Sequence, residues 1–260
     1  ITVPSSYTGS AHRIIVQSGG KLIVQSGAKL RVLNEIINEN TDPSSVVFES
    51  NSDFIQIFNP TSTIYNSGKV TVQRTTNPMD KYGYTYWGSP VTGQNTITGT
   101  PLYPGANAAY RWNTNPGGSD PDGLIGWVQH NGEMIPGQGY ILRAPQNLSP
   151  WNQQIGGVWQ KAPVTAKFIG VPNNGDCTVD IVPSATGLIP HYNAKMTYMS
   201  NPYPATIHID KFLSQYGEGI ALSGNARIIP TVYFWTHATT PILNATGGYT
   251  YPTADFASYT

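Results

Sequence analysis

The chain has 260 residues, of which 11% are charged, and its 14 basic and 14 acidic side chains cancel. An average soluble domain carries about 25% charged residues, so this surface is polar without being charged, as in many secreted and cell-surface β proteins. The absence of a basic run argues against a nucleic-acid binder, and no apolar run reaches the roughly 18–20 residues that span a bilayer. The opening ITVPSSYTGS lacks the basic start and apolar run of a signal peptide, so we expect residue 1 to be a mature end or the first ordered residue of a longer chain.

The motif Val-Gln-Ser-Gly occurs at Val16–Gly19 and again at Val24–Gly27. Around the second copy, KLIVQSGAKLRV (21–32) alternates apolar and polar residues, as a strand with one buried face does. This alternation predicts which side chains point into a core (Leu22, Val24, Leu30 and Val32) and which face water (Lys21, Lys29 and Arg31). The Ser-Gly pairs mark turns, because glycine tolerates positive φ.

A related pattern returns in FIQIFNPTSTIYNSGKVTVQR (54–74). Two short strands cannot bury a face alone, whereas stacked coils can. The repeated Val-Gln-Ser-Gly motif therefore predicts a short parallel β-solenoid over roughly residues 10–76, within a first unit of residues 1–78. The alternative is an ordinary β-hairpin whose repeat is a coincidence.

From Met79 onward, short apolar runs rich in Trp and Tyr are separated by Pro and Gly. Eight such runs read as strands that end in turns: 82–91, 108–113, 123–129, 137–145, 164–172, 177–183, 195–204 and 231–237. Regular short strands with turn signals predict a β-sandwich-like domain over residues 79–260. One helix is expected at 209–217, with Asp210 at its start and Gly217 as its stop. The predicted fold class is all-β, a short parallel β-solenoid followed by a β-sandwich-like domain with one short helix.

Several segments of the chain carry a resemblance to a known module. They are GKVTVQRTT (68–76), YTYWGSPVTGQ (84–94), MIPGQGYILRAP (134–145), GVPNNGDCTVDI (170–181), MSNPYPATIHIDKFL (199–213) and VYFWTHATTP (232–241). They resemble a module common in large secreted proteins of Bacteroidota, especially flavobacteria, where it lies ahead of the C-terminal sorting signal of the type IX secretion system. The resemblance covers nearly the whole chain. It implies export across the outer membrane and display at or release from the cell surface, in proteins that include gliding-motility adhesins.

Two positions depart from the resembling pattern. Gly88 stands where serine is usual, and Ser200 stands where glycine is usual before Asn-Pro-Tyr-Pro. The module also normally continues beyond the final DFASYT (255–260), so the resemblance implies that the chain is a piece of something longer. It supplies no catalytic set that transfers to this sequence.

The sequence shows no motif of a known enzyme class. Its five His residues have neither HxH nor HExxH spacing, which argues against zinc, and there is no GxSxG and no phosphate-binding glycine loop. We therefore expect no catalytic residues. A polysaccharide hydrolase would need two carboxylates about 5–10 Å apart across a cleft, and Glu133 and Asp210 are the acids to check because each adjoins an apolar stretch.

One loop is a candidate for calcium. The segment NTNPGGSDPDG (113–123) offers the hard oxygens that Ca²⁺ prefers, on Asn113, Asn115, Asp120 and Asp122. It lacks the full EF-hand pattern with its terminal Glu, so the alternative is a plain turn. No other cofactor is expected.

The aromatic residues suggest a second kind of site. Trp151 and Trp159 flank the polar segment NQQIGGV, where exposed rings could stack on sugars; the alternative is that both rings pack against the protein. Trp87 and Trp235 lie in apolar strands and are expected in the core. Cys177 lies in a strand-like run, where a small buried thiol is expected.

Three functions remain compatible with the sequence. The first is a non-catalytic structural or adhesive segment of a secreted, surface-displayed protein, whose partners would be other domains of the same long chain, the secretion machinery and surface glycans. The second is a carbohydrate-binding module that uses exposed aromatics. The third is an accessory domain of a polysaccharide-degrading enzyme.

Overall fold

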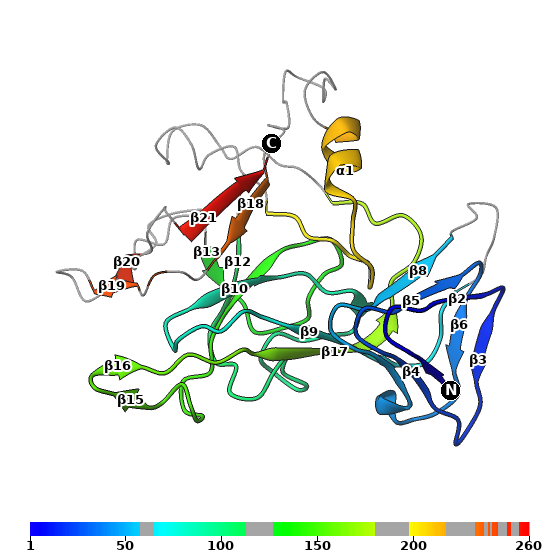
Figure 1. Ribbon diagram of the computed structural model, residues 1–260, viewed down its shortest axis with the longest axis horizontal. Coiled ribbons are helices and arrows are strands. Elements are labelled where there is room, and N and C mark those ends of the chain that lie inside the picture. Colours follow the sequence, from blue (N-terminus) through cyan, green and yellow to red (C-terminus); the bar gives the residue numbers. More distant parts are fainter. Residues whose placement is uncertain are drawn as a thin grey trace.

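The computed structural model describes residues 1–57, 65–112, 127–179, 198–216, 232–236, 239, 241–243, 249–250 and 255–259. The regular structure of these residues is predominantly β, with one α-helix, which confirms the prediction of an all-β chain with a short helix (Figure 1). No helix in this part of the chain is long and apolar enough to cross a bilayer.

The N-terminal residues wind through three parallel sheets in turn (Figure 1). The first sheet contains β1 (Thr2–Val3), β4 (Leu22–Val24), β7 (Val46–Phe48) and β9 (Val70–Thr75); the second contains β2 (Thr8–Ala11), β5 (Lys29–Val32) and β8 (Asp53–Gln56); the third contains β3 (Ile14–Val16) and β6 (Ile36–Asn38). A 3₁₀ turn, η1 (Pro43–Ser45), precedes β7. Thr8 lies opposite Lys29, which lies opposite Asp53, so stacked strands are 21 and 24 residues apart.

The two copies of Val-Gln-Ser-Gly form successive corners of this coil. Gly20 N–H donates to Gln17 O at 2.8 Å and Ala28 N–H donates to Gln25 O at 2.9 Å, which closes the same β-turn twice. The third residue of each turn is a glycine with φ of +78°. The strands on either side of the second copy, β4 and β5, are therefore neighbouring sides of the coil, and each stacks on strands one turn away.

The predicted orientation of the side chains is confirmed. Leu22, Val24, Leu30 and Val32 are buried, and Lys21, Lys29 and Arg31 are exposed. Both strands pair in parallel with strands one turn away, so the hairpin alternative is wrong.

The corner between the first and second sheets is repeated in three turns of the coil. Its left-handed position is occupied by Ser6 (φ 63°), Gly27 (φ 78°) and Asn51 (φ 65°). Gly27 N–H donates to Asn51 O at 3.1 Å, so the corners are joined by backbone hydrogen bonds. Glycine has no Cβ to clash with the backbone, and asparagine adopts left-handed φ more often than other residues do. Serine is therefore the least suited of the three to this conformation.

The first sheet does not end with the coil. Strand β17 (Thr165–Pro172) pairs antiparallel with β9 through six residue pairs, from Thr165 opposite Thr75 to Gly170 opposite Val70. The two-residue strand β11 (Val91–Thr92) then pairs with β17 and forms the outer edge. The sheet therefore crosses the proposed boundary at residues 78/79, and one continuous apolar core spans both sides of it.

A four-stranded antiparallel sheet lies next to this core. Its strands, in order, are β10 (Tyr84–Trp87), β14 (Tyr140–Arg143), β12 (Ala109–Trp112) and β13 (Trp127–Gln129). Trp87 is buried, as expected, and its ring lies 5.8 Å from that of Phe168 on β17. Tyr86 contacts the rings of Tyr198 at 5.2 Å and Trp235 at 6.4 Å.

The remaining elements are short. The helix α1 (Ile209–Tyr216) matches the predicted one, β15 (Gln154–Ile155) and β16 (Val158–Trp159) form a hairpin, β18 (Val232–Trp235) pairs with β21 (Phe256–Tyr259), and β19 (Ile242–Leu243) pairs with β20 (Tyr249–Thr250). Two predicted strands differ from the structure. The described parts of 177–183 and 195–204 are irregular, apart from a bridge between Met199 and Gln138.

Candidate functional site

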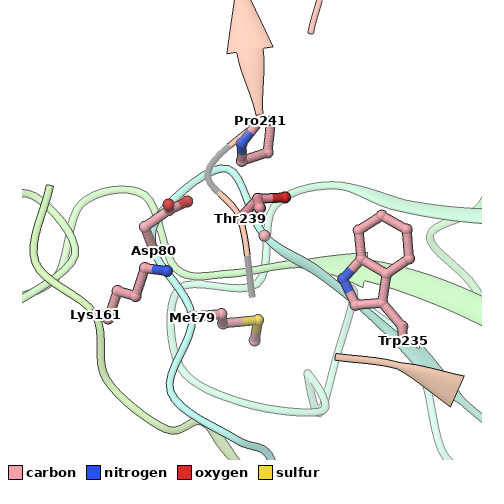
Figure 2. Close-up of a pocket in the computed structure, with 7 residues that line it drawn as sticks. Met79, Asp80, Lys161, Trp235, Thr239 and Pro241 are labelled. Atoms are coloured by element: carbon pink, nitrogen blue, oxygen red, sulfur yellow. The ribbon is translucent and has the colours of Figure 1, made fainter. Parts of the chain in front are cut away.

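Figure 2 shows a small hollow between Met79 and Trp235, with Asp80 and Lys161 across from the indole. Its volume is about 10 Å³, which is the space of one water molecule. The Asp80 carboxylate is buried and accepts the Tyr82 N–H at 2.9 Å. The hollow is therefore too small for a substrate, and its single carboxylate has a structural partner.

A larger groove lies where the coil meets two irregular segments. It is formed by residues 54–56 of β8, residues 173–176 just after β17, and residues 201–207 just before α1. Its volume is about 300 Å³, at the lower end of the range for small-molecule sites. It is the larger of the two hollows and the better candidate for binding.

The segment 201–207 is fixed to the coil at the edge of β8. Phe54 N–H donates to Pro204 O at 2.9 Å, which continues the hydrogen bonding of the strand. The buried Asp53 carboxylate accepts both the N–H and the hydroxyl of Thr206, at 2.8 and 3.0 Å. The charge of Asp53 thus serves to hold one wall of the groove.

A buried amide fixes the second wall. The side chain of Asn173 donates to Ser89 O at 3.1 Å and to Pro202 O at 2.8 Å, and it accepts the Thr92 hydroxyl at 2.8 Å. These bonds use both N–H donors of the amide, so Asn173 acts as a brace between the segments.

Asn201 has a similar role inside its own turn. Its side chain donates to Ala205 O at 2.6 Å and accepts the Tyr203 N–H at 3.1 Å. The Tyr203 hydroxyl donates to Gly175 O, which ties the two irregular segments together. Burial raises the pKa of Tyr203, and its neighbour Cys177 adds to this, so the phenol stays neutral near pH 7.

Two polar side chains of the groove are not used in this way. Asn174 is half-buried and Asp176 is exposed, and neither side chain has a hydrogen-bond partner among the described residues. They lie on either side of Gly175 in the sequence, and the Gly175 carbonyl accepts the hydrogen bond from the Tyr203 hydroxyl. The groove therefore presents a free carboxamide, a free carboxylate and a partly exposed aromatic ring.

Sequence reasoning missed this groove, because its segments are far apart and none carries a binding motif. Its one local signal is the cluster Asn-Asn-Gly-Asp at residues 173–176. Cys177 lies at the end of this cluster and is half-buried in an irregular segment, not in a strand as expected.

The two tryptophans predicted to bind sugars lie elsewhere and have different surroundings. Trp151 packs against the core, and its indole N–H donates to Met79 O at 3.1 Å. Trp159 is on the β15–β16 hairpin, with the Lys81 ammonium 3.8 Å from its ring centre. One face of this ring is therefore already covered by a cation–π contact.

The acids singled out from the sequence have ordinary partners. Glu133 accepts the Gly93 N–H at 3.1 Å, and Asp210 accepts the Tyr259 hydroxyl and lies 3.8 Å from His208. Neither lines either of the two hollows described above.

The calcium candidates Asn113, Asn115, Asp120 and Asp122 lie outside the described residues. Within the described ranges, no group of three or more His, Cys, Asp or Glu side chains is placed to hold a metal ion.

Comparison with known proteins adds the family and nothing further. No curated protein and no solved structure matches the chain. One family model, described as a domain of unknown function (DUF8693), matches residues 1–260. Because this match covers the full length, the chain belongs to the DUF8693 family.

Proposed function

We propose that the chain is a non-catalytic structural or adhesive segment of a large secreted, cell-surface protein. In this proposal residues 1–78 are a short β-solenoid that serves as a stalk or spacer, and residues 79–260 are a β-sandwich-like domain on its end. The observation that supports it best is the pairing of β17 with β9, because it joins the two units through one sheet.

The geometry of this junction suits a mechanical role. The six residue pairs between β9 and β17 form one antiparallel ladder, so the coil and the second unit are joined by several backbone hydrogen bonds and not only by the connecting segment of the chain. The core beneath them is continuous. Tension on the coil is therefore passed to the second unit without a flexible linker.

A single-molecule pulling experiment tests this role. With handles at both ends, we expect the chain to lengthen in one event of about 90 nm, at roughly 3.5 Å per residue. A separate earlier event of about 25 nm, the length of the coil alone, would show that the two units do not share the load.

A cross-link gives the matched control. The hydroxyls of Thr75 and Thr165 lie 3.0 Å apart across the junction, so Thr75→Cys with Thr165→Cys, in a Cys177→Ser background, should form a disulfide. The disulfide then shields from the pulling force the segment between Thr75 and Thr165, which are 90 positions apart, and should shorten the event by about 30 nm. The single variant Thr75→Cys should show no such change.

The export route is part of the proposal. The uncharged polar surface and the resemblance to modules of Bacteroidota support secretion by the type IX system, with other domains of the same chain and the secretion machinery as partners. Antibodies against residues 1–260 should label intact cells and lose that label when a type IX component is deleted. Labelling only after cell lysis would contradict extracellular display.

The absence of catalysis is tested separately. Incubation with a panel of polysaccharides should release no reducing ends. Release that is abolished by Glu133→Gln or Asp210→Asn would overturn the non-catalytic proposal.

A further inference from the structure

We infer that the groove formed by residues 54–56, 173–176 and 201–207 is a binding site for a neutral carbohydrate. This site is separate from the tryptophans discussed above and does not depend on the mechanical role.

The groove is formed before any ligand arrives. Asp53 holds Thr206, Asn173 holds Pro202, and the Tyr203 hydroxyl donates to Gly175 O. Walls that are fixed in this way lose little conformational freedom on binding, which favours affinity. Binding should therefore need no large rearrangement.

The free groups match sugar hydroxyls. A carboxamide offers a donor and an acceptor, and a carboxylate accepts two hydrogen bonds. Asn174 and Asp176 supply these groups within three residues of each other. Vicinal hydroxyls of a pyranose ring can donate to the carboxylate and exchange bonds with the amide, while the Tyr203 ring offers an apolar surface for C–H groups.

The charge of the groove decides between ligand classes. Among the described residues that line it there is no Lys, Arg or His, and Asp176 is the one acidic side chain. Phosphorylated, sulfated or uronic-acid ligands would meet a carboxylate and no cation, so they should be repelled. A volume of about 300 Å³ accommodates one or two sugar units of a longer chain that passes through the open sides.

The test is a glycan array probed with the purified chain, followed by calorimetric titration of the best neutral oligosaccharides. Asn174→Ala and Asp176→Asn should each weaken binding about tenfold, since each removes hydrogen bonds to the sugar. Asn107→Ala is the matched control, because Asn107 is exposed and outside the groove. All three substitutions are at partly or fully exposed positions, and unchanged melting temperatures would show that the variants fold.

Three outcomes would overturn the inference. The first is that no neutral glycan binds, even if a peptide does. The second is that acidic glycans bind in preference to neutral ones. The third is that Trp159→Ala abolishes binding while Asn174→Ala and Asp176→Asn leave it unchanged, which would place the site on the β15–β16 hairpin. None of these outcomes bears on the pulling experiment, so the two proposals fail independently.

Discussion

The contact between Gly88 and Ser200 gives the sharpest prediction. A Cβ built on Gly88 would lie 2.2 Å from both Cβ and Oγ of Ser200 and 3.3 Å from Asn201 O. Ser200 cannot move away easily, because its N–H donates to Gly137 O at 2.8 Å and its hydroxyl donates to Gln138 O at 2.9 Å. There is room for one side chain between the two positions.

Gly88→Ser should therefore destabilise the fold. The backbone of Gly88 is outside the left-handed region, so the cost is steric, about 1–3 kcal/mol for an overpacked site. For a chain of this size that lowers the melting temperature by roughly 2–12 °C. Ser200→Gly alone should cost about 1–2 kcal/mol, through a lost hydrogen bond and added backbone freedom.

The double variant Gly88→Ser with Ser200→Gly tests whether the two side chains compete for the same space. If the two side chains compete for one space, its loss should be smaller than the sum of the single losses by at least about 1 kcal/mol. Urea denaturation of the four proteins measures this coupling, and Gly132→Ala is the control, since its Cβ would meet nothing closer than 3.8 Å. Additive losses, or a Gly88→Ser protein as stable as the parent, would refute the steric reasoning.

Three further predictions concern the coil, the tyrosines and the loop at 113–123. Ser6, Gly27 and Asn51 all have left-handed backbones. Ser6→Gly should therefore raise the free energy of unfolding by about 1 kcal/mol and Asn51→Gly by less, while Gly27→Ala should lower it by about 1–2 kcal/mol. Thermal melts that rank the three variants in another order would contradict the assignment of these residues to equivalent corners. Burial raises the pKa of Tyr84 to about 12, so the folded state keeps a proton that the unfolded chain loses near pH 10, and stability should fall by up to about 2–3 kcal/mol between pH 10 and 12. Urea midpoints over that range should fall less steeply for Tyr84→Phe than for the parent. If the loop at 113–123 holds calcium, EDTA should lower the melting temperature and added Ca²⁺ should restore it; an unchanged melt would leave a plain turn.

The sequence predicted what depends on neighbouring residues. Alternation around Leu22 and Leu30 placed the buried and exposed faces correctly, and the capping pattern at Asp210 located the helix. Which strands stack on one another does not follow from the sequence, because the same Ser-Gly turn occupies different corners of the coil. A turn motif indicates the local backbone conformation and does not indicate which strand pairs with the strand that follows the turn.

The groove and the β15–β16 hairpin are not predicted from the sequence, for different reasons. The groove joins segments that begin at residues 54, 173 and 201, and no local pattern records that they meet. The β15–β16 hairpin did carry a signal, since Gly156 and Gly157 both have positive φ (59° and 78°), as the tightest hairpin turns require. The flanking strands are only two residues long, too short for an alternating pattern, so the sequence alone predicts a polar loop between Trp151 and Trp159 where the structure has a hairpin.

The late arrival of β17 has a consequence during synthesis. The parallel strands of the coil find partners 21 to 24 residues back along the chain, so each can pair as soon as it is made. The outer edge of β9 must wait for β17, which begins 90 residues after the last residue of β9. At roughly 5–20 residues per second, that edge remains without β17 for about 5–18 s. During this interval the nascent chain presents an open strand to its neighbours on the same messenger RNA, and this is when it is most vulnerable to aggregation.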